Sequence, residues 1–168
     1  MASQNGFFGQ FQQYAMTAGA VLNMPYQVIL GQWAHESTYG TSDLAVRANN
    51  FAGIKYTSNA DFQSGSYSGY NSISSFVQDY IRVMSLPIYS DVRNADGINA
   101  TIEALGRSPY AEDSSYADKL KSIIGSSAND TSQGVKGNVV AAGGKILNVL
   151  MNPIVLVLAL IYLMIKKK

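Results

Sequence analysis

The stretch GQWAHESTYG, residues 31–40, places a glutamate where the surrounding pattern calls for an apolar residue. In the residues before it, apolar side chains recur at spacings of three and four, which is the repeat of a helix with one buried face. Glu36 follows Trp33 by three residues and therefore falls on that face. Burying a carboxyl group is costly unless the group is paired or used in chemistry. The sequence therefore makes Glu36 a candidate functional residue on a helix that begins near Pro25 and ends just before Gly40.

Two physical effects favour the protonated form of a glutamate in this position. Desolvation on an apolar face disfavours the charged carboxylate, and the negative end of the helix dipole acts in the same direction. A carboxylic acid that keeps its proton near neutral pH can donate it to the leaving-group oxygen of a glycosidic bond. The same pattern also fits a structural glutamate that reaches solvent at the helix end or caps a neighbouring loop. The helix by itself leaves both roles open for Glu36.

The composition excludes several classes of protein. The chain of 168 residues is 47% apolar and contains no cysteine and a single histidine, His35. Disulfides, iron–sulfur clusters and thiolate zinc sites are excluded. A calcium site made of carboxylates alone stays open, but no calcium loop motif is present, and neither a metal nor a cofactor is expected. Residues 1–125 carry ten acidic and seven basic side chains, whereas residues 126–168 carry one acid and five lysines. Without clustered basic residues in the first segment, a nucleic acid partner is not expected.

The periodicity predicts a mainly helical domain with a small insert of strands and loops. Residues 51–74 are rich in Gly, Ser, Asn and Tyr, which indicates short strands and turns. A capping-box pattern at Ser75 and Gln78 predicts the start of the helix that follows this insert. Apart from the helix that carries Glu36, helical spacing of apolar residues is found in residues 7–22, 76–84, 98–105 and 116–124, with Pro87, Gly106 and Gly125 as stop signals for the last three.

The C-terminal part of the chain has a different character. Residues 126–145 are small and polar, and as a flexible linker they would span roughly 25 Å. Residues 146–165 contain no charged residue and are followed by three lysines at 166–168. Twenty such residues in a helix match a hydrocarbon core of about 30 Å. A core helix is seldom apolar on all faces and then closed by lysines, so we expect a transmembrane helix at 146–165 and a short basic tail.

Several short motifs occur in a fixed order between about residue 5 and residue 125. Residues 34–42 read AHESTYGTS, which has the form A-x-E-S-x-x-G-x-S, and residues 49–55 read NNFAGIK. FVQDY follows at 76–80, and YAEDSSYADKL closes the series at 110–120. Together they resemble the glucosaminidases of glycoside hydrolase family 73, which include flagellar peptidoglycan hydrolases and autolysins.

This resemblance implies a lysozyme-like fold of the mainly α (α+β) class and cleavage of the β-1,4 glycan strand of peptidoglycan. It makes Glu36 the general acid and places Tyr116 beside the scissile bond, with Tyr110, Asn50 and Phe51 as further substrate-binding residues. Taken by themselves, these side chains also allow plainer roles. Tyr116 could be a core aromatic residue, and Asn50 and Phe51 could serve turn formation and core packing.

The second catalytic group is less well defined. Larger members of the family carry a glutamate in the strand insert, whereas residues 51–74 contain a single carboxylate, Asp61. Asp61 is therefore the candidate second catalytic residue, although a solvated turn aspartate fits as well, and Asp43 could fill the role or cap a short helix. Attack by water, by the substrate's own N-acetyl group, or by an intramolecular hydroxyl as in lytic transglycosylases all remain open. A regular helix would point His35 away from the face of Glu36, so no catalytic role is expected for it.

These observations divide the chain into a catalytic domain (1–125), a linker (126–145), a transmembrane helix (146–165) and a basic tail (166–168). Residues 7–22 lack the basic start and the continuous apolar core of a signal peptide. A C-terminal span without a leader would leave the domain in the cytoplasm, where there is no peptidoglycan, while the trailing lysines favour a cytoplasmic C-terminus. Either orientation is unusual for a cell-wall enzyme.

A bacteriophage with a lipid membrane removes this difficulty, because its virion can carry the enzyme to the cell wall. The sequence therefore predicts a membrane-anchored peptidoglycan glycosidase that acts in phage entry or exit, with peptidoglycan, the virion membrane and other virion proteins as partners. A tail-anchored hydrolase of the bacterial inner membrane is the alternative location. A lytic transglycosylase on the same glycan, or a catalytically weak wall-binding membrane protein, is the alternative function.

Overall fold

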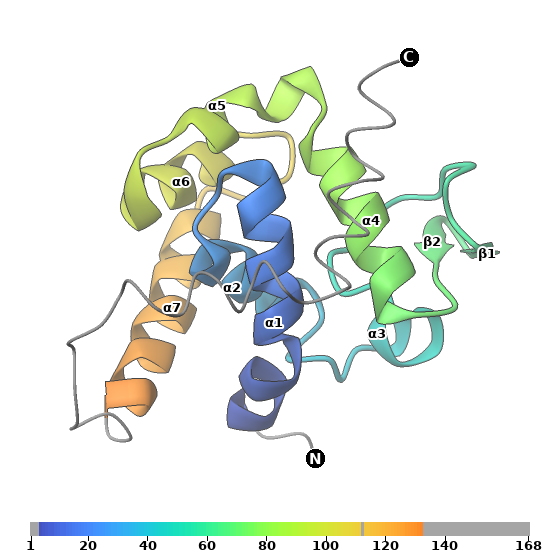
Figure 1. Ribbon diagram of the computed structural model, residues 1–168, viewed down its shortest axis with the longest axis horizontal. Helices are drawn as coiled ribbons and strands as arrows, with labels where there is room; N and C mark the ends of the chain where they lie inside the picture. The colour runs from blue at the N-terminus through green and yellow to red at the C-terminus, as the bar shows by residue number, and fades with distance from the viewer. Residues whose placement is uncertain (1–3, 112, 133–168) are drawn as a thin grey trace. The chain divides into compact units, whose positions relative to one another are not determined.

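The computed structural model describes residues 4–111 and 113–132, which form a mainly helical domain with one small sheet (Figure 1). The mainly helical class with a short strand insert, expected from the periodicity, is therefore confirmed. The elements in chain order are α1 (Gln4–Leu22), α2 (Tyr26–Glu36), α3 (Asp43–Ala48), β1 (Phe62–Ser64), β2 (Tyr67–Gly69), α4 (Ile73–Met84), the 3₁₀ helix η1 (Pro87–Tyr89), α5 (Ser90–Asn94), α6 (Gly97–Gly106) and α7 (Tyr116–Ser132).

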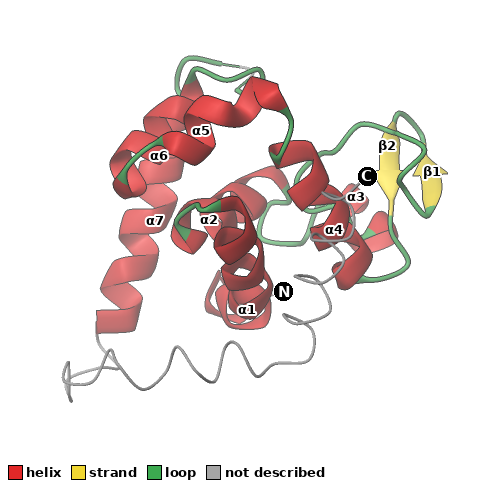
Figure 2. Ribbon diagram, turned by 45° about the horizontal axis from the view of Figure 1, so that its top comes forward, coloured by secondary structure: helices red, strands yellow, loops and turns green. Residues whose placement is uncertain are grey.

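The core forms around α1 and α2, which pack against each other, and α4 also packs against α1. Both views place α4 and the β1–β2 hairpin on one side of this pair, and α5, α6 and the start of α7 on the other (Figures 1 and 2). Trp33 of α2 is fully buried. Its ring is in edge contact with the rings of Phe76 and Tyr80 on α4, at centroid distances of 5.1 Å and 5.2 Å. Gly31 permits close packing of α7, because a Cβ there would lie 2.8 Å from Cγ1 of Ile124.

Helix α2 ends at Glu36, so the prediction that it continues almost to Gly40 is wrong. The Ser37 hydroxyl donates to the carbonyl of Trp33 at 2.6 Å and accepts from the backbone N–H of Gly40 at 2.8 Å. The chain then passes through three left-handed residues, with φ values of 50° at Thr38, 53° at Tyr39 and 78° at Gly40. This turn leaves Glu36 as the last helical residue, with its side chain at the end of the helix.

The small sheet supports the segment that follows Asn50. Strands β1 and β2 pair antiparallel, with Phe62 opposite Gly69. On its other edge β2 contacts residues 54–56, since the N–H of Ser68 donates to the carbonyl of Ile54 at 2.9 Å and Lys55 forms a bridge with Tyr67. The hairpin therefore fixes the backbone of a loop that lies next to the end of α2.

Two predicted helix boundaries differ from the structure. Helix α4 is capped by Ser72, whose hydroxyl accepts from the N–H of Ser75 at 3.0 Å, so the capping box predicted at Ser75 and Gln78 is wrong. Helix α7 continues through Gly125 to Ser132, so the predicted stop at Gly125 is wrong and residues 126–132 of the predicted linker are helical. A single glycine within a helix is tolerated at a modest cost, which explains why the stop signal failed.

The rest of the predicted linker, the predicted transmembrane helix at 146–165 and the basic tail lie outside the described residues. Within the part of the chain that the structure describes, no helix combines the length and the apolar character needed to cross a membrane.

Candidate active site

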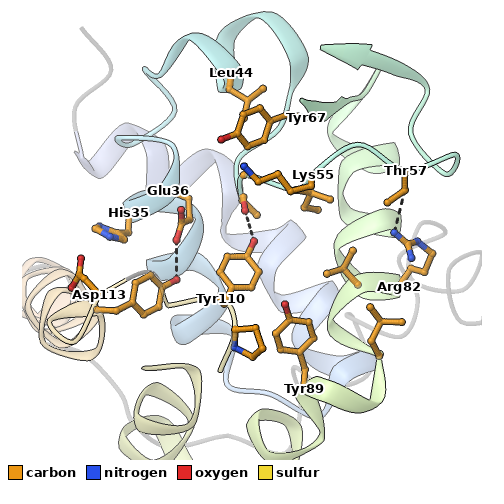
Figure 3. Close-up of a pocket in the computed structure, with 17 residues that line it drawn as sticks. His35, Glu36, Leu44, Lys55, Thr57, Tyr67, Arg82, Tyr89, Tyr110 and Asp113 are labelled. Atoms are coloured by element: carbon orange, nitrogen blue, oxygen red, sulfur yellow. Dashed lines mark hydrogen bonds between the residues drawn. The ribbon is translucent and has the colours of Figure 1, made fainter. Parts of the chain in front are cut away.

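A cavity of about 550 Å³ lies at the C-terminal end of α2 (Figure 3). Most of its wall comes from four segments: the end of α2, the loop at 52–57, the region from α4 to η1, and the loop that leads into α7; Leu44 of α3 and Tyr67 of β2 complete it. The lining residues are His35, Glu36, Leu44, Ala52, Gly53, Ile54, Lys55, Thr57, Tyr67, Arg82, Val83, Leu86, Tyr89, Pro109, Tyr110, Asp113 and Tyr116.

Glu36 is half-buried and presents its carboxyl group to this cavity. The hydroxyl of Tyr116 donates to Oε1 at 2.9 Å, across a separation of 80 residues in the chain. On the other side the backbone of Gly53 comes close, because a Cβ at this position would lie 3.8 Å from Oε2. Gly53 has a φ of 61°, where residues with a side chain are strained, so the backbone conformation favours glycine at this position.

Tyr116 is buried, and burial raises the pKa of its hydroxyl above the usual value. The negative charge of Glu36 and the hydrogen bond to it raise this pKa further, whereas a contact with Gln32 lowers it. Gln32 lies one turn before Glu36, is fully buried, and accepts a hydrogen bond from the Tyr80 hydroxyl at 2.6 Å. The Tyr116 hydroxyl therefore stays protonated at neutral pH and acts as a donor to Glu36.

His35 lies in the cavity wall with Glu36, a place that the helix repeat did not predict. Its ring is in edge contact with the ring of Tyr116, with centroids 5.5 Å apart. Burial lowers the pKa of His35, and the charge of Lys119 lowers it further, against an opposing contribution from Asp113. The helix repeat did place His35 off the face of Glu36, but the loop before α7 folds over both residues and brings them to one cavity.

Asp113 is a further residue of the wall, and no role was predicted for it from the sequence. Its carboxylate accepts hydrogen bonds from Lys119 at 2.7 Å and from the hydroxyl of Ser115 at 2.5 Å. The Lys119 contact and the hydrogen bonds from Ser115 lower the pKa of Asp113 to about 2. Asp113 is therefore ionised at neutral pH and is already paired with a cation.

The predicted substrate-binding residues divide into two groups. Tyr110 and Tyr116 line the cavity, and the Tyr110 hydroxyl donates to the backbone carbonyl of Ala52. Asn50 and Phe51 are buried beneath the wall and do not line it. Phe51 packs against other core aromatic residues, with its ring centroid 4.5 Å from that of Phe11.

The side chain of Asn50 shapes the loop that does line the cavity. Its Nδ2 donates to the carbonyls of Ile54 at 2.9 Å and Ser68 at 2.8 Å. Its Oδ1 accepts from the backbone N–H groups of Ile54 at 3.0 Å and Ala52 at 3.3 Å. The hydrogen-bonding groups of this side chain are therefore directed at the protein backbone, and the loop carries Gly53 to the side of Glu36.

The two candidate aspartates lie outside the cavity wall. Asp61 is exposed, and its Oδ2 accepts from the backbone N–H of Asn71 at 2.8 Å. Asp43 is the exposed first residue of α3 and pairs with Arg47 at 3.5 Å. The structure thus brings Glu36, Tyr110 and Tyr116 together, without Asp61. Among the described residues, no three His, Asp or Glu side chains are grouped in a way that could hold a metal ion.

A half-buried carboxyl group in a cavity lined by tyrosines can protonate the oxygen of a glycosidic bond, while the rings offer apolar faces to the sugars. The fold and the site together define a lysozyme-like glycoside hydrolase. The family model for glucosaminidases, described as mannosyl-glycoprotein endo-beta-N-acetylglucosaminidase, matches residues 12–129, and the chain belongs to this family. The family resemblance drawn from the motifs is therefore confirmed.

Solved structures with the same fold come from several bacteria. The glycoside hydrolase domain of FlgJ from Salmonella typhimurium has a TM-score of 0.65 at 24% identity, covering 79% of this chain and 92% of that domain. A peptidoglycan hydrolase from Sphingomonas sp. A1 has a TM-score of 0.64 at 25% identity, covering 83% of this chain and all of that one (100%). The catalytic domain of the autolysin Auto from Listeria monocytogenes has a TM-score of 0.62 at 26% identity, covering 79% of this chain and 90% of that domain. No curated protein matches the sequence.

We expect Tyr116→Phe to lower kcat about tenfold while changing the free energy of unfolding by only about 1 kcal/mol. Phenylalanine retains the ring packing and removes only the hydroxyl that orients the Glu36 carboxyl group. The measurement is kcat on glycan strands together with urea unfolding. Tyr14→Phe, on α1 and outside the cavity wall, is the matched control and should leave kcat unchanged. Equal kcat values for both variants would contradict an orienting role for Tyr116.

Proposed function

We propose that this protein cleaves the β-1,4 glycan strand of peptidoglycan with Glu36 as the general acid. The observation that carries the proposal is the Glu36 carboxyl group, held by the Tyr116 hydroxyl inside a cavity large enough to bind sugars. Membership of the glucosaminidase family supports glycan cleavage. The names of relatives at 25% and 26% identity, a peptidoglycan hydrolase and an autolysin, support peptidoglycan as the substrate.

In this mechanism Glu36 transfers its proton to the leaving oxygen while the bond to the anomeric carbon breaks, and a nucleophile then attacks that carbon. Among the described residues, Asp113 is the other carboxylate in the cavity wall, and it is paired with Lys119. This pairing favours a nucleophile that the substrate itself supplies at the anomeric carbon. Its N-acetyl group would lead to hydrolysis, whereas its 6-hydroxyl would make the protein a lytic transglycosylase, the second candidate function.

Digestion of peptidoglycan in ¹⁸O-labelled water, followed by mass spectrometry of the new chain ends, tests both functions. Hydrolysis consumes one water molecule per bond and leaves ¹⁸O at each new reducing end. Intramolecular attack consumes no water and leaves 1,6-anhydro ends without label. The expected result is labelled reducing ends. Unlabelled anhydro ends would replace the hydrolase by the transglycosylase, and the absence of new ends of either kind would contradict the proposed function.

We further propose that residues 146–165 anchor the enzyme in a lipid membrane, the virion membrane of a bacteriophage, from which it opens the cell wall at entry or exit. The support is the uncharged segment of twenty residues that precedes Lys166, Lys167 and Lys168. A catalytic domain tied to a membrane by a linker can reach a wall that lies next to that membrane. A wall-clearing band at 18.1 kDa in zymograms of purified virions supports a role at entry. A band confined to membranes of infected cells supports a role at exit. A band in uninfected cells supports the alternative of a hydrolase anchored in the bacterial inner membrane.

The full chain is expected to float with lipid vesicles in a density gradient, whereas a chain that ends at Ser132 should stay at the bottom and remain active. The reason is that the 146–165 segment gains from transfer into hydrocarbon, while all residues that line the cavity lie before residue 133. Leu156→Arg should weaken flotation, because arginine at the centre of a span costs about 3 kcal/mol, and Leu156→Ile is its control. A full chain that stays at the bottom would contradict the anchor.

A further inference from the structure

Two cationic side chains line the same cavity as Glu36 and have no role in the chemistry described above. Lys55 extends from the loop that Asn50 shapes, and Arg82 extends from α4. Figure 3 shows the amino end of Lys55 turned toward the side of the cavity that holds Glu36, while Arg82 lies beside Thr57. We call Lys55 and Arg82 the cationic pair.

Lys55 is held in place without being neutralised. Its backbone pairs with Tyr67 at the edge of β2, and its Nζ lies 4.0 Å from the centroid of the Tyr67 ring. A cation over an aromatic face is attracted to the ring and keeps its N–H donors. Within the part of the chain that the structure describes, no carboxylate forms an ion pair with Lys55.

Arg82 is fixed by a buried partner. Its Nε donates to Oδ1 of Asp79 at 2.5 Å, and the side chain of Asp79 is only 3% exposed against 36% for Arg82. The Tyr70 hydroxyl holds the other oxygen of Asp79 at 2.8 Å, and Nη2 of Arg82 reaches Thr57 Oγ1 at 3.4 Å. One edge of the guanidinium group is therefore anchored in the protein, and the residue still forms part of the cavity wall.

We infer that the two members of the cationic pair bind carboxylates carried by the glycan, an inference that rests on the proposed function. In peptidoglycan every second sugar bears a lactyl ether whose carboxyl group is either free or extended by a peptide with carboxylates of its own. Lysine and arginine side chains form hydrogen bonds with such groups in which donor and acceptor carry opposite charges, whereas a neutral sugar offers only uncharged acceptors. Binding every second sugar fixes the register of the strand, so only one of the two alternating glycosidic bonds lies at Glu36.

The test compares Lys55→Met on three substrates that differ in carboxylates. These are neutral N-acetylglucosamine oligomers, peptide-free glycan strands with free lactyl carboxylates, and strands with their peptides intact. Methionine is an unbranched apolar side chain of similar length and removes the charge. Lys121→Met is the matched control, because Lys121 pairs with Glu103 at 2.5 Å on an exposed surface outside the cavity wall. Arg82→Lys keeps a cation beside Asp79 and changes only the shape of the donor group.

We expect Lys55→Met to raise KM on peptide-free strands about tenfold more than on neutral oligomers, since one hydrogen bond to a charged group is lost. The excess should shrink as the salt concentration rises. The new reducing ends should change from one sugar type to a mixture of two. Arg82→Lys should produce the same changes to a smaller extent. If the larger rise in KM is seen only on strands with intact peptides, the ligand is the peptide carboxylates and not the lactyl group.

Equal KM changes for Lys55→Met and Lys121→Met on all three substrates, with unchanged reducing ends, would overturn the inference while leaving the proposed function in place. Binding of the Glu36→Gln variant to the same three ligands needs no cleavage and separates the two questions. Loss of carboxylate preference when Lys55→Met is added to that variant supports the cationic pair even where cleavage fails. An affinity that is the same for neutral and carboxylate-bearing strands overturns it.

Discussion

Glu36→Gln is expected to reduce glycan cleavage by a factor of about 10²–10⁴ or more while leaving the fold intact. The amide has nearly the shape of the carboxyl group and can still accept the hydrogen bond from Tyr116, but it cannot supply the proton that the leaving oxygen requires. The measurement is the rate of release of new reducing ends, with the circular dichroism and thermal melting of the variant recorded alongside. Near-normal activity in a folded variant would exclude Glu36 as the general acid.

Two further substitutions sharpen this result. Glu103→Gln is the matched control, because Glu103 lies on α6 outside the cavity wall and pairs with Lys121, and its activity should equal that of the parent. Asp61→Asn tests the second catalytic group expected from the sequence. Since Asp61 is exposed and outside the wall, its loss should change the rate by no more than about threefold. A defect close to that of Glu36→Gln would instead give Asp61 the role of activating water.

Asn50→Ala is expected to destabilise the domain by about 3–5 kcal/mol, a large part of the total stability of a typical domain. The substitution removes four hydrogen bonds and leaves two backbone N–H groups and two carbonyls without these partners beneath the cavity wall. The Asn50 side chain is only 1% exposed, so water cannot easily replace it. The measurement is the free energy of unfolding in urea.

Asn59→Ala, at an exposed position of the same loop region, is the control and should cost less than about 0.5 kcal/mol. Asn50→Asp keeps the oxygen that accepts from Ala52 and Ile54 but loses both donated bonds, so it separates the two halves of the network. An Asn50→Ala variant that unfolds at the urea concentration of the parent would show that the loop is held by other contacts.

Local patterns in the sequence were sufficient for those features that depend on neighbouring residues. The repeat of apolar residues located α1, α4 and α6, and the glycine- and serine-rich run located the hairpin. A glutamate on the apolar face of a predicted helix, together with the family motifs, made Glu36 the candidate general acid. The end of α2 was predicted too late in the chain because the Ser37 hydroxyl donates a hydrogen bond to the carbonyl of Trp33, a contact that composition does not reveal.

The features that were missed depend on packing between distant segments. His35 reaches the cavity because the loop before α7 folds across the end of α2, some 80 residues earlier in the chain. Gln32 could have been noticed as a polar residue on the same helix, one turn before Glu36. Its contacts with Tyr80 and Tyr116 still could not have been inferred without the arrangement of three helices.

The hydrogen bond between Tyr116 and Glu36 also has a consequence for the timing of synthesis. The acid is translated early, whereas the tyrosine that orients it is the first residue of α7 and leaves the ribosome 80 residues later. A growing chain that ends before Tyr116 already contains α1, α2 and the hairpin but has an unoriented acid. The arrangement of the cavity around Glu36 is therefore complete only after Tyr116 has been made, so chains that end ahead of α7 lack the hydroxyl that holds the Glu36 carboxyl group.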